Sequence, residues 1–224
     1  MWGRSPTVRM NEDLLVDARI RALSRLSGAT IHELRGAANS VALHLQLLTM
    51  EAQRDDDGER RQRSLAAVDD GRRRLFDIAE VFVRHAVIPD ARPSEFDLAR
   101  VTGDAVALSR PYAVQRRVDM TLAPSRMAPA VHGRRDVVSQ VMLDLLLDML
   151  DRAPDGGSVD VTVESENGAG AVRAALRTSS AQTTPDADSV ARAESAMQWA
   201  GGELRQDGDG LVLRLPVPSP GESQ

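Results

Sequence analysis

The chain has 224 residues, of which 42% are hydrophobic and 27% charged, with a formal net charge of -5 at pH 7. It contains no cysteine, which excludes disulfides, thiol nucleophiles and cysteine-based zinc sites. The acidic balance and the aromatic content of 3% argue against a nucleic-acid-binding protein, which needs clustered basic residues and aromatic stacking platforms.

Membrane-spanning and secreted classes are also disfavoured. No window approaches the roughly 18 apolar residues that a spanning helix needs, and the first residues lack the apolar run of a signal peptide. We therefore expect a cytoplasmic protein that does not bind a membrane. The length allows two modest domains, each with its own core.

The first predicted element is a long helix. From Asn11 to about Gln53 there is no proline, and apolar residues recur three and four positions apart. The polar segment 53–63 predicts a turn, after which the same spacing resumes and ends at the prolines of segment 87–93. This pattern predicts an antiparallel helical hairpin.

Two helices leave part of each apolar stripe uncovered. We therefore expect two chains to pair into a four-helix bundle. Its predicted core contains Leu34, Val41, Leu45, Leu75 and Phe82.

After residue 90 the pattern changes to alternating strands and helices. Strands are predicted at 95–98, 117–123, 128–133, 158–165 and 171–178, with a final hairpin at 202–217. Helices are predicted from about residue 98 to Arg110, at 134–153 and at 189–200, the last ended by Gly201 and Gly202. We expect a mixed sheet with helices on one face. The predicted domains are 1–90 for the hairpin and 91–217 for the α/β part, with a disordered tail at 218–224.

His32 is the main candidate for chemistry. It lies about 160° around the helix from Leu34, so we expect it to face solvent. Neutral imidazole is a nucleophile near pH 7, and the adjacent Glu33 can hold its second nitrogen and accept a proton. Gly36 leaves room for a partner one turn along. The alternative is an exposed histidine without a role.

The other three histidines lack this setting. None has an acid beside it, and no two show metal-ligand spacing with a carboxylate. We interpret His44, His85 and His132 as structural and expect no metal site.

Three segments of the chain contain motifs of one known family. The segment "HELRGAANS" at 32–40 resembles the H box of sensor histidine kinases, H-E-L-R-x-P-L, on the first helix of a dimerisation and phosphotransfer hairpin. "SQVMLDLLLDMLDRAPDGGSV" at 139–159 is similar to their N-box helix. "WAGGELRQDGDGLVLRLPV" at 199–217 is similar to the closing helix and hairpin of their ATP-binding domain. The resemblance covers nearly the whole chain.

Several departures separate the chain from an ATP-dependent kinase. Asp144 and Asp148 stand where the family has two N-box asparagines, and their spacing places both on one helix face. No glycine lies between Gly170 and Gly201, so the family's glycine-rich phosphate cradle cannot form. We expect Asp144 and Asp148 to mark a vestigial nucleotide site, with a solvated helix face as the alternative. Gly36 replaces the Thr or Asn that positions water for dephosphorylation.

The resemblance therefore implies a long antiparallel helical hairpin forming a dimeric four-helix bundle, followed by a degenerate histidine-kinase ATPase-like α/β sandwich. Such chains resemble the dimeric histidine phosphotransferases that include the sporulation and Caulobacter-type relay proteins. The implied function is a bacterial two-component phosphorelay, in which His32 passes a phosphoryl group between receiver-domain aspartates. No cofactor is expected on this chain, because Mg²⁺ comes from the receiver.

The expected partners are response regulator receiver domains, a second copy of the chain and a hybrid histidine kinase. The receiver is expected on the outward face of the first helix, at Arg35, Gly36, Asn39, Leu43, Leu47 and Met50, unless the last three pack against the second domain. Two other functions remain open. One is a non-catalytic pseudokinase adaptor that does not use His32, and the other is an atypical ATP-dependent histidine kinase.

Overall fold

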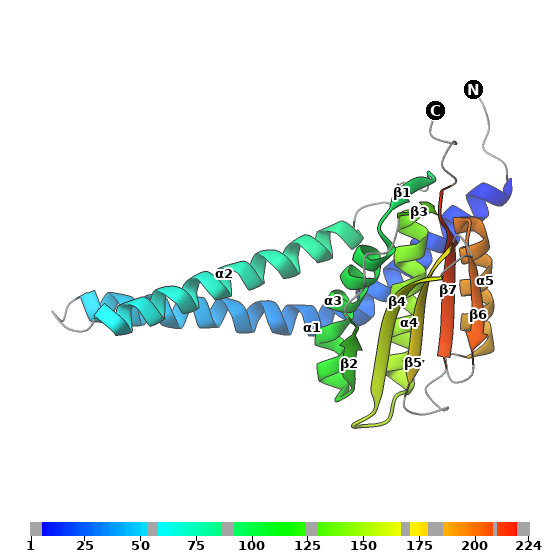
Figure 1. The fold of residues 1–224 in the computed structure, drawn as a ribbon. Coiled ribbons are helices and arrows are strands. Elements are labelled where there is room, and N and C mark those ends of the chain that lie inside the picture. Colours follow the sequence, from blue (N-terminus) through cyan, green and yellow to red (C-terminus); the bar gives the residue numbers. More distant parts are fainter. Residues whose placement is uncertain are drawn as a thin grey trace. The chain divides into compact units, whose positions relative to one another are not determined.

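The structure is a computed structural model that describes residues 6–52, 58–86, 92–123, 130–166, 171–178, 186–207 and 210–218. In chain order, the helices are α1 (Pro6–Ala52), α2 (Gly58–Ala86), α3 (Leu98–Arg116), α4 (Arg135–Arg152) and α5 (Ala187–Ala200). The strands are β1 (Ser94–Phe96), β2 (Asp119–Leu122), β3 (Val131–Gly133), β4 (Ser158–Glu166), β5 (Ala171–Thr178), β6 (Glu203–Asp207) and β7 (Gly210–Pro216). Figure 1 follows this order by colour.

The chain forms two compact units. The hairpin unit comprises Ser27–Val87, and the α/β unit combines Met1–Leu26 with Ile88–Gln224. α1 is one continuous helix through the point where the chain passes from one unit to the other. By contacts, the first 26 residues group with the α/β unit. The division into domains 1–90 and 91–217 stays a prediction.

The hairpin unit contains the second part of α1 and α2, which run antiparallel (Figure 1). The two helices approach closely at Gly71 of α2, where a Cβ would lie 2.6 Å from Val41 Cγ2 and 3.5 Å from the Ala37 carbonyl oxygen. Ala37 and Ser64 are buried, while Leu34, Val41 and Leu75 are half-buried. The predicted helical hairpin is confirmed, and the side chain of Phe82 lies outside the described residues.

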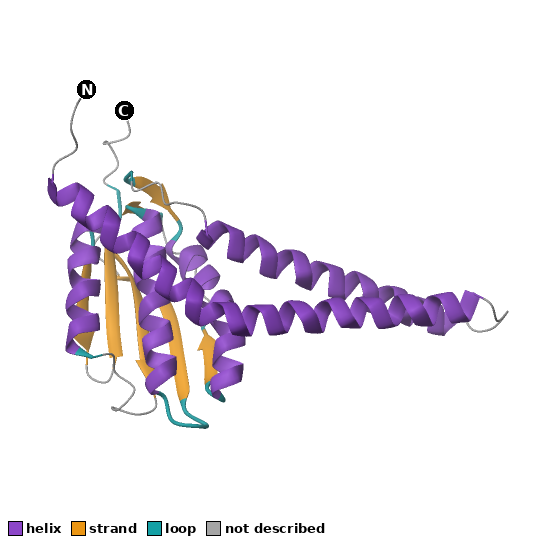
Figure 2. Ribbon diagram, turned by 180° about the vertical axis from the view of Figure 1, so that it is seen from behind, coloured by secondary structure: helices purple, strands orange, loops and turns teal. Residues whose placement is uncertain are grey.

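The α/β unit is built on a five-stranded mixed sheet with the order β2-β4-β5-β7-β6. β2 pairs in parallel with β4, and the remaining neighbours are antiparallel. Figure 2 shows α3, α4 and α5 on one face of this sheet. β1 and β3 form a separate antiparallel pair. The α/β sandwich with helices on one face is therefore as predicted.

The core lies between the sheet and α4. Val159, Val161 and Val163 alternate along β4 and are at most 4% exposed, which is the period of two that buries one strand face. Eleven of the 18 residues of α4 are buried. α4 is flanked by α3 and α5, and its remaining outer face carries the acidic residues described below.

α3 departs from the prediction by continuing through Pro111, beyond the expected end near Arg110. A proline in a helix interior costs about 3 kcal/mol, because it removes a backbone hydrogen bond and crowds the preceding turn. Here the following residues are held by tertiary contacts. Ala113 is 1% exposed, and the Tyr112 hydroxyl donates to Asp151 Oδ1 at 2.5 Å. These tertiary contacts therefore allow the helix to continue beyond Pro111.

The start and end of α5 follow local rules. Its first turn is capped by the Asp186 side chain, which accepts from Ser189 N at 2.7 Å. It ends at Gly201, whose φ of 90° is the left-handed conformation that a glycine adopts without strain. None of the described helices carries an apolar stretch long enough to cross a membrane.

Candidate functional site

His32 lies on α1 within the hairpin unit, and its side chain is exposed. Within the described part of the chain, its imidazole makes no hydrogen bond or ion pair. Gly28 and Gly36 lie one helical turn before and after it, on the same helix face. A Cβ built on either glycine would meet no described neighbour within 4 Å. No side chain therefore covers the imidazole from the positions one turn before and one turn after it.

Glu33 is engaged by the second helix. Arg74 Nη2 and Nε donate to Glu33 Oε1 at 2.9 and 3.2 Å. Consecutive helical residues point about 100° apart, so Glu33 faces α2 while His32 faces solvent. That Glu33 orients His32 stays a prediction, because the Glu33 carboxylate pairs with Arg74 and makes no hydrogen bond to His32 among the described residues.

The expected docking face is exposed. Leu43 and Met50 are 54% and 55% exposed, and Leu47 is 38% exposed. Arg35 and Asn39, on the turns next to His32, are exposed as well. That this face of α1 binds a partner stays a prediction.

The remaining histidines differ from His32. His44 Nδ1 lies 2.8 Å from the carbonyl oxygen of Ser40, so its ring is held by its own helix. His132 is exposed on β3, and the side chain of His85 lies outside the described residues. Among the described residues, no group of three His, Asp or Glu side chains could hold a metal ion.

Asp148 of α4 is paired with the first part of α1, inside the α/β unit. Arg25 Nη1 lies 3.0 Å from Asp148 Oδ1 and 3.7 Å from Asp151 Oδ2. One guanidinium therefore bridges two carboxylates that lie on neighbouring positions of the α4 surface. These contacts hold the first part of α1 against α4.

Asp144 is the most perturbed acid of this unit among the described residues. Burial raises the pKa of its carboxyl to about 7, although a hydrogen bond from Gln140 and the charges of Arg21 and Arg25 oppose the shift. Gln140 Nε2 donates to Asp144 Oδ1 at 2.9 Å. Close to neutral pH, Asp144 can therefore exist in either protonation state.

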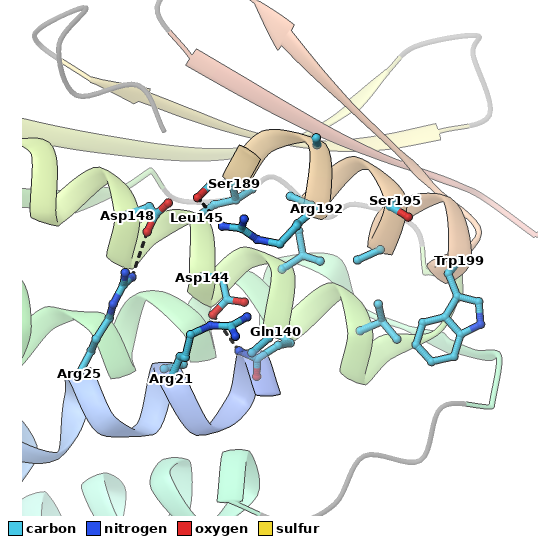
Figure 3. Close-up of a pocket in the computed structure, with 17 residues that line it drawn as sticks. Arg21, Arg25, Gln140, Asp144, Leu145, Asp148, Ser189, Arg192, Ser195 and Trp199 are labelled. Carbon is cyan, nitrogen blue, oxygen red and sulfur yellow. Dashed lines mark hydrogen bonds and ion pairs between the residues drawn. The ribbon is translucent and has the colours of Figure 1, made fainter. Parts of the chain in front are cut away.

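A cavity of about 370 Å³ lies between the first part of α1, α4 and α5 (Figure 3). Asp144 and Asp148 both line it, as their spacing on one helix face predicts. The α1 side contributes Ala18, Arg21, Ala22 and Arg25, which recur three and four residues apart. The cavity was not predicted from the sequence. The local feature that could have indicated it is the helical spacing of these two alanines and two arginines.

The first turn of α5, at the edge of this cavity, already holds a carboxylate. Besides capping the backbone, Asp186 Oδ2 accepts from Arg152 Nη2 at 2.6 Å. An anion at this helix start would meet the negative charge of Asp186.

Neither a protein-family model nor a curated protein matches the sequence. Several solved structures align with the chain. The Acinetobacter baumannii histidine kinase AdeS aligns at 13% identity and a TM-score of 0.47, over 84% of this chain and 98% of that one. The catalytic domain of histidine kinase ThkA aligns at 16% identity and a TM-score of 0.46, over 57% of this chain and 99% of that one. A complex of ThkA with the response regulator TrrA aligns at 14% identity and a TM-score of 0.44. The alignment covers 99% of this chain and 69% of that one.

Proposed function

We propose that this protein is a histidine phosphotransferase that relays a phosphoryl group between receiver domains of response regulators through His32. The observation that carries the proposal is the setting of His32, an exposed imidazole with no partner among the described residues and with a glycine one turn to either side. A nucleophile that must reach the phosphate of another protein needs this access.

The chemistry requires little from this chain beyond alignment. A neutral imidazole nitrogen of His32 attacks the phosphorus of a receiver aspartyl phosphate, the N–P bond forms, and the aspartate carboxylate leaves. A second receiver aspartate then attacks the phosphorus, and the N–P bond breaks. Glu33, once released from Arg74, would accept the proton from the second ring nitrogen. The receiver supplies Mg²⁺, and in-line positioning supplies most of the rate.

Three features support a relay over an ATP-dependent kinase. The start of α5, where the family's glycine-rich loop would bind phosphate, carries the carboxylate of Asp186. The chain has no glycine between Gly170 and Gly201. Asp148 is paired with Arg25 from α1, which offsets the negative charge that would attract a metal ion.

A homodimer is part of the proposal. Ile31 and Leu45 on α1 are 48% and 49% exposed and lie within about 60° of Leu34 around the helix. On α2, Leu65 and Phe76 are 51% and 65% exposed and share one face. A single chain therefore leaves apolar stripes beside its helix–helix contact. A second hairpin covering both stripes would form a four-helix bundle.

The test is transfer of labelled phosphate from a phosphorylated receiver, compared between the wild-type protein, His32→Gln and His44→Gln. The control variant removes a second histidine from the same helix. We expect label on wild-type protein and on His44→Gln, and none on His32→Gln. Receiver binding without label on the wild-type protein would instead support an adaptor. Label taken directly from ATP and Mg²⁺ would support an atypical kinase.

A further inference from the structure

The cavity between α1, α4 and α5 has the dimensions of a small-molecule site. Its volume of about 370 Å³ falls within the range of roughly 300–1,000 Å³ typical of such sites. Much of its wall is apolar, with Val141 and Leu145 from α4 and Ala196 and Trp199 from α5. All of it lies within the α/β unit.

The charged groups that line the cavity are three arginines and two aspartates. Arg25 and Asp148 neutralise each other at 3.0 Å. Arg192 donates to the neutral hydroxyl of Ser189 at 2.9 Å. Among the described residues, Arg21 and Arg192 make no direct ion pair, although Arg21 attracts Asp144 and Arg192 attracts Asp186 over a longer distance. Figure 3 shows both of these side chains extending into the space between the helices. The lining therefore carries excess positive charge, whichever protonation state Asp144 adopts.

One buried acceptor in the lining lacks a partner. Gln140 is 2% exposed, and its amide nitrogen donates to Asp144. Its carbonyl oxygen Oε1 is buried without a hydrogen bond in the described structure. An unsatisfied buried acceptor costs roughly 1–3 kcal/mol. Because Oε1 is covered in this structure, a rotation of the Gln140 side chain that brought Oε1 to a ligand donor would recover this free energy.

From the shape, the charge and the unpartnered acceptor together, we infer that this cavity binds a small aromatic carboxylate that carries a hydroxyl or N–H donor at its far end. The carboxylate pairs with Arg21 and Arg192, which can offer paired N–H groups to its two oxygens. The ring lies against the apolar wall beside Trp199, and the donor reaches Gln140. This site does not depend on the chemistry of His32.

The test is isothermal titration calorimetry of the full chain with three matched compounds. Para-hydroxyphenylacetate has the charge, the ring and the donor, phenylacetate lacks the donor, and methyl para-hydroxyphenylacetate lacks the charge. We expect para-hydroxyphenylacetate to bind most tightly and each of the others about tenfold more weakly, which corresponds to one lost interaction of this kind. Equal affinity for the methyl ester, or no binding of any of the three, would overturn the inference.

Variants locate the site. Arg21→Gln and Arg192→Gln each remove one cation at similar side-chain length, and Ala18→Leu fills the cavity from the half-buried side of α1. Each should weaken binding of para-hydroxyphenylacetate about tenfold or more. Arg100→Gln, at an exposed arginine of α3 outside the lining, is the control and should bind like wild type. If all three cavity variants retain wild-type affinity while folded by circular dichroism, the compound binds elsewhere and the inference fails.

Discussion

Arg25 and Asp148 are 123 residues apart in the sequence and lie 3.0 Å apart in the structure. The same guanidinium also approaches Asp151 at 3.7 Å. Since Arg25 belongs to α1 and both acids belong to α4, this contact ties the first part of α1 to the α/β unit. The contact is therefore one of the interactions that hold the N-terminal part of α1 against α4.

The contribution of this pair is measurable by a double-mutant cycle of Arg25→Ala and Asp148→Asn. Arg25 is partly exposed to solvent, so we expect a coupling free energy of only about 0.5–1 kcal/mol in urea unfolding. Arg21→Ala on the same face of α1 is the control, and it should show a smaller coupling to Asp148→Asn because Arg21 makes no ion pair with Asp148 among the described residues. Additive effects of Arg25→Ala and Asp148→Asn would show that the pair contributes nothing to stability.

The raised pKa of Asp144 makes the stability of the protein depend on pH. Between the usual aspartate pKa of 3.8 and the folded value of about 7, the folded state keeps a proton that the unfolded chain loses. The free energy of unfolding therefore falls as pH rises through this window, and stays lowered above it. The full loss is on the order of 4 kcal/mol. Asp144→Asn should remove this part of the pH dependence.

Chemical denaturation at several pH values between 4 and 8 checks this expectation. The comparison needs a carboxylate that is exposed, and Asp119→Asn on β2 should follow the wild-type curve. If Asp144→Asn and wild type lose stability in parallel with rising pH, Asp144 does not titrate in this window.

Gly71 allows the close approach of the two hairpin helices. In Gly71→Ala, the new Cβ would lie 2.6 Å from Val41 Cγ2, and valine has little rotamer freedom in a helix. We expect a net destabilisation of about 1–2 kcal/mol, since overpacking outweighs the gain of about 1 kcal/mol in helix propensity. Val41→Ala added to Gly71→Ala should restore part of the loss in thermal unfolding.

The matched control for Gly71 is Gly36→Ala. Its Cβ would meet no described neighbour within 4 Å, so only the propensity term remains and stability should rise. A Gly71→Ala protein that is as stable as Gly36→Ala would mean that the helices separate without cost at this position.

Leu43 and Leu45 test two different surfaces of the same helix. Leu45 lies about 20° from Leu34, and Leu43 about 180° from it. Leu45→Arg should therefore weaken the proposed homodimer, seen as a lower mass in analytical ultracentrifugation. Leu43→Arg should leave the mass unchanged and reduce the proposed phosphoryl transfer from a receiver. A monomeric Leu43→Arg protein, or a dimeric Leu45→Arg protein, would assign these faces differently.

The elements of the fold could be predicted because local periodicity determines them. The alternation of Val159, Val161 and Val163 indicates a strand with one buried face, and Gly201 marks the end of α5 in the sequence as in the structure. The proline rule failed at Pro111, because contacts of the next residues outweigh a local penalty.

The partners of the charged residues could not be predicted in the same way. Glu33 meets Arg74 at a separation of 41 residues, and this pairing depends on the register of the hairpin. The sequence placed Glu33 beside His32 because the two are neighbours in the chain. The division of α1 after Leu26 could not be predicted from the sequence either, because the apolar spacing continues unchanged from one unit into the next.

The two glycines that flank His32 also affect the stability of the helix that carries it. A glycine in a helix interior costs about 1 kcal/mol relative to alanine, so Gly28 and Gly36 together lower helix stability by about 2 kcal/mol around His32. The backbone of residues 28–36 should therefore open more often than the rest of the hairpin part of α1, and its amide hydrogens should exchange faster with solvent. Gly28→Ala should slow this exchange without adding a side-chain contact. In the proposed relay, such local opening would let the imidazole adjust its direction toward each receiver in turn.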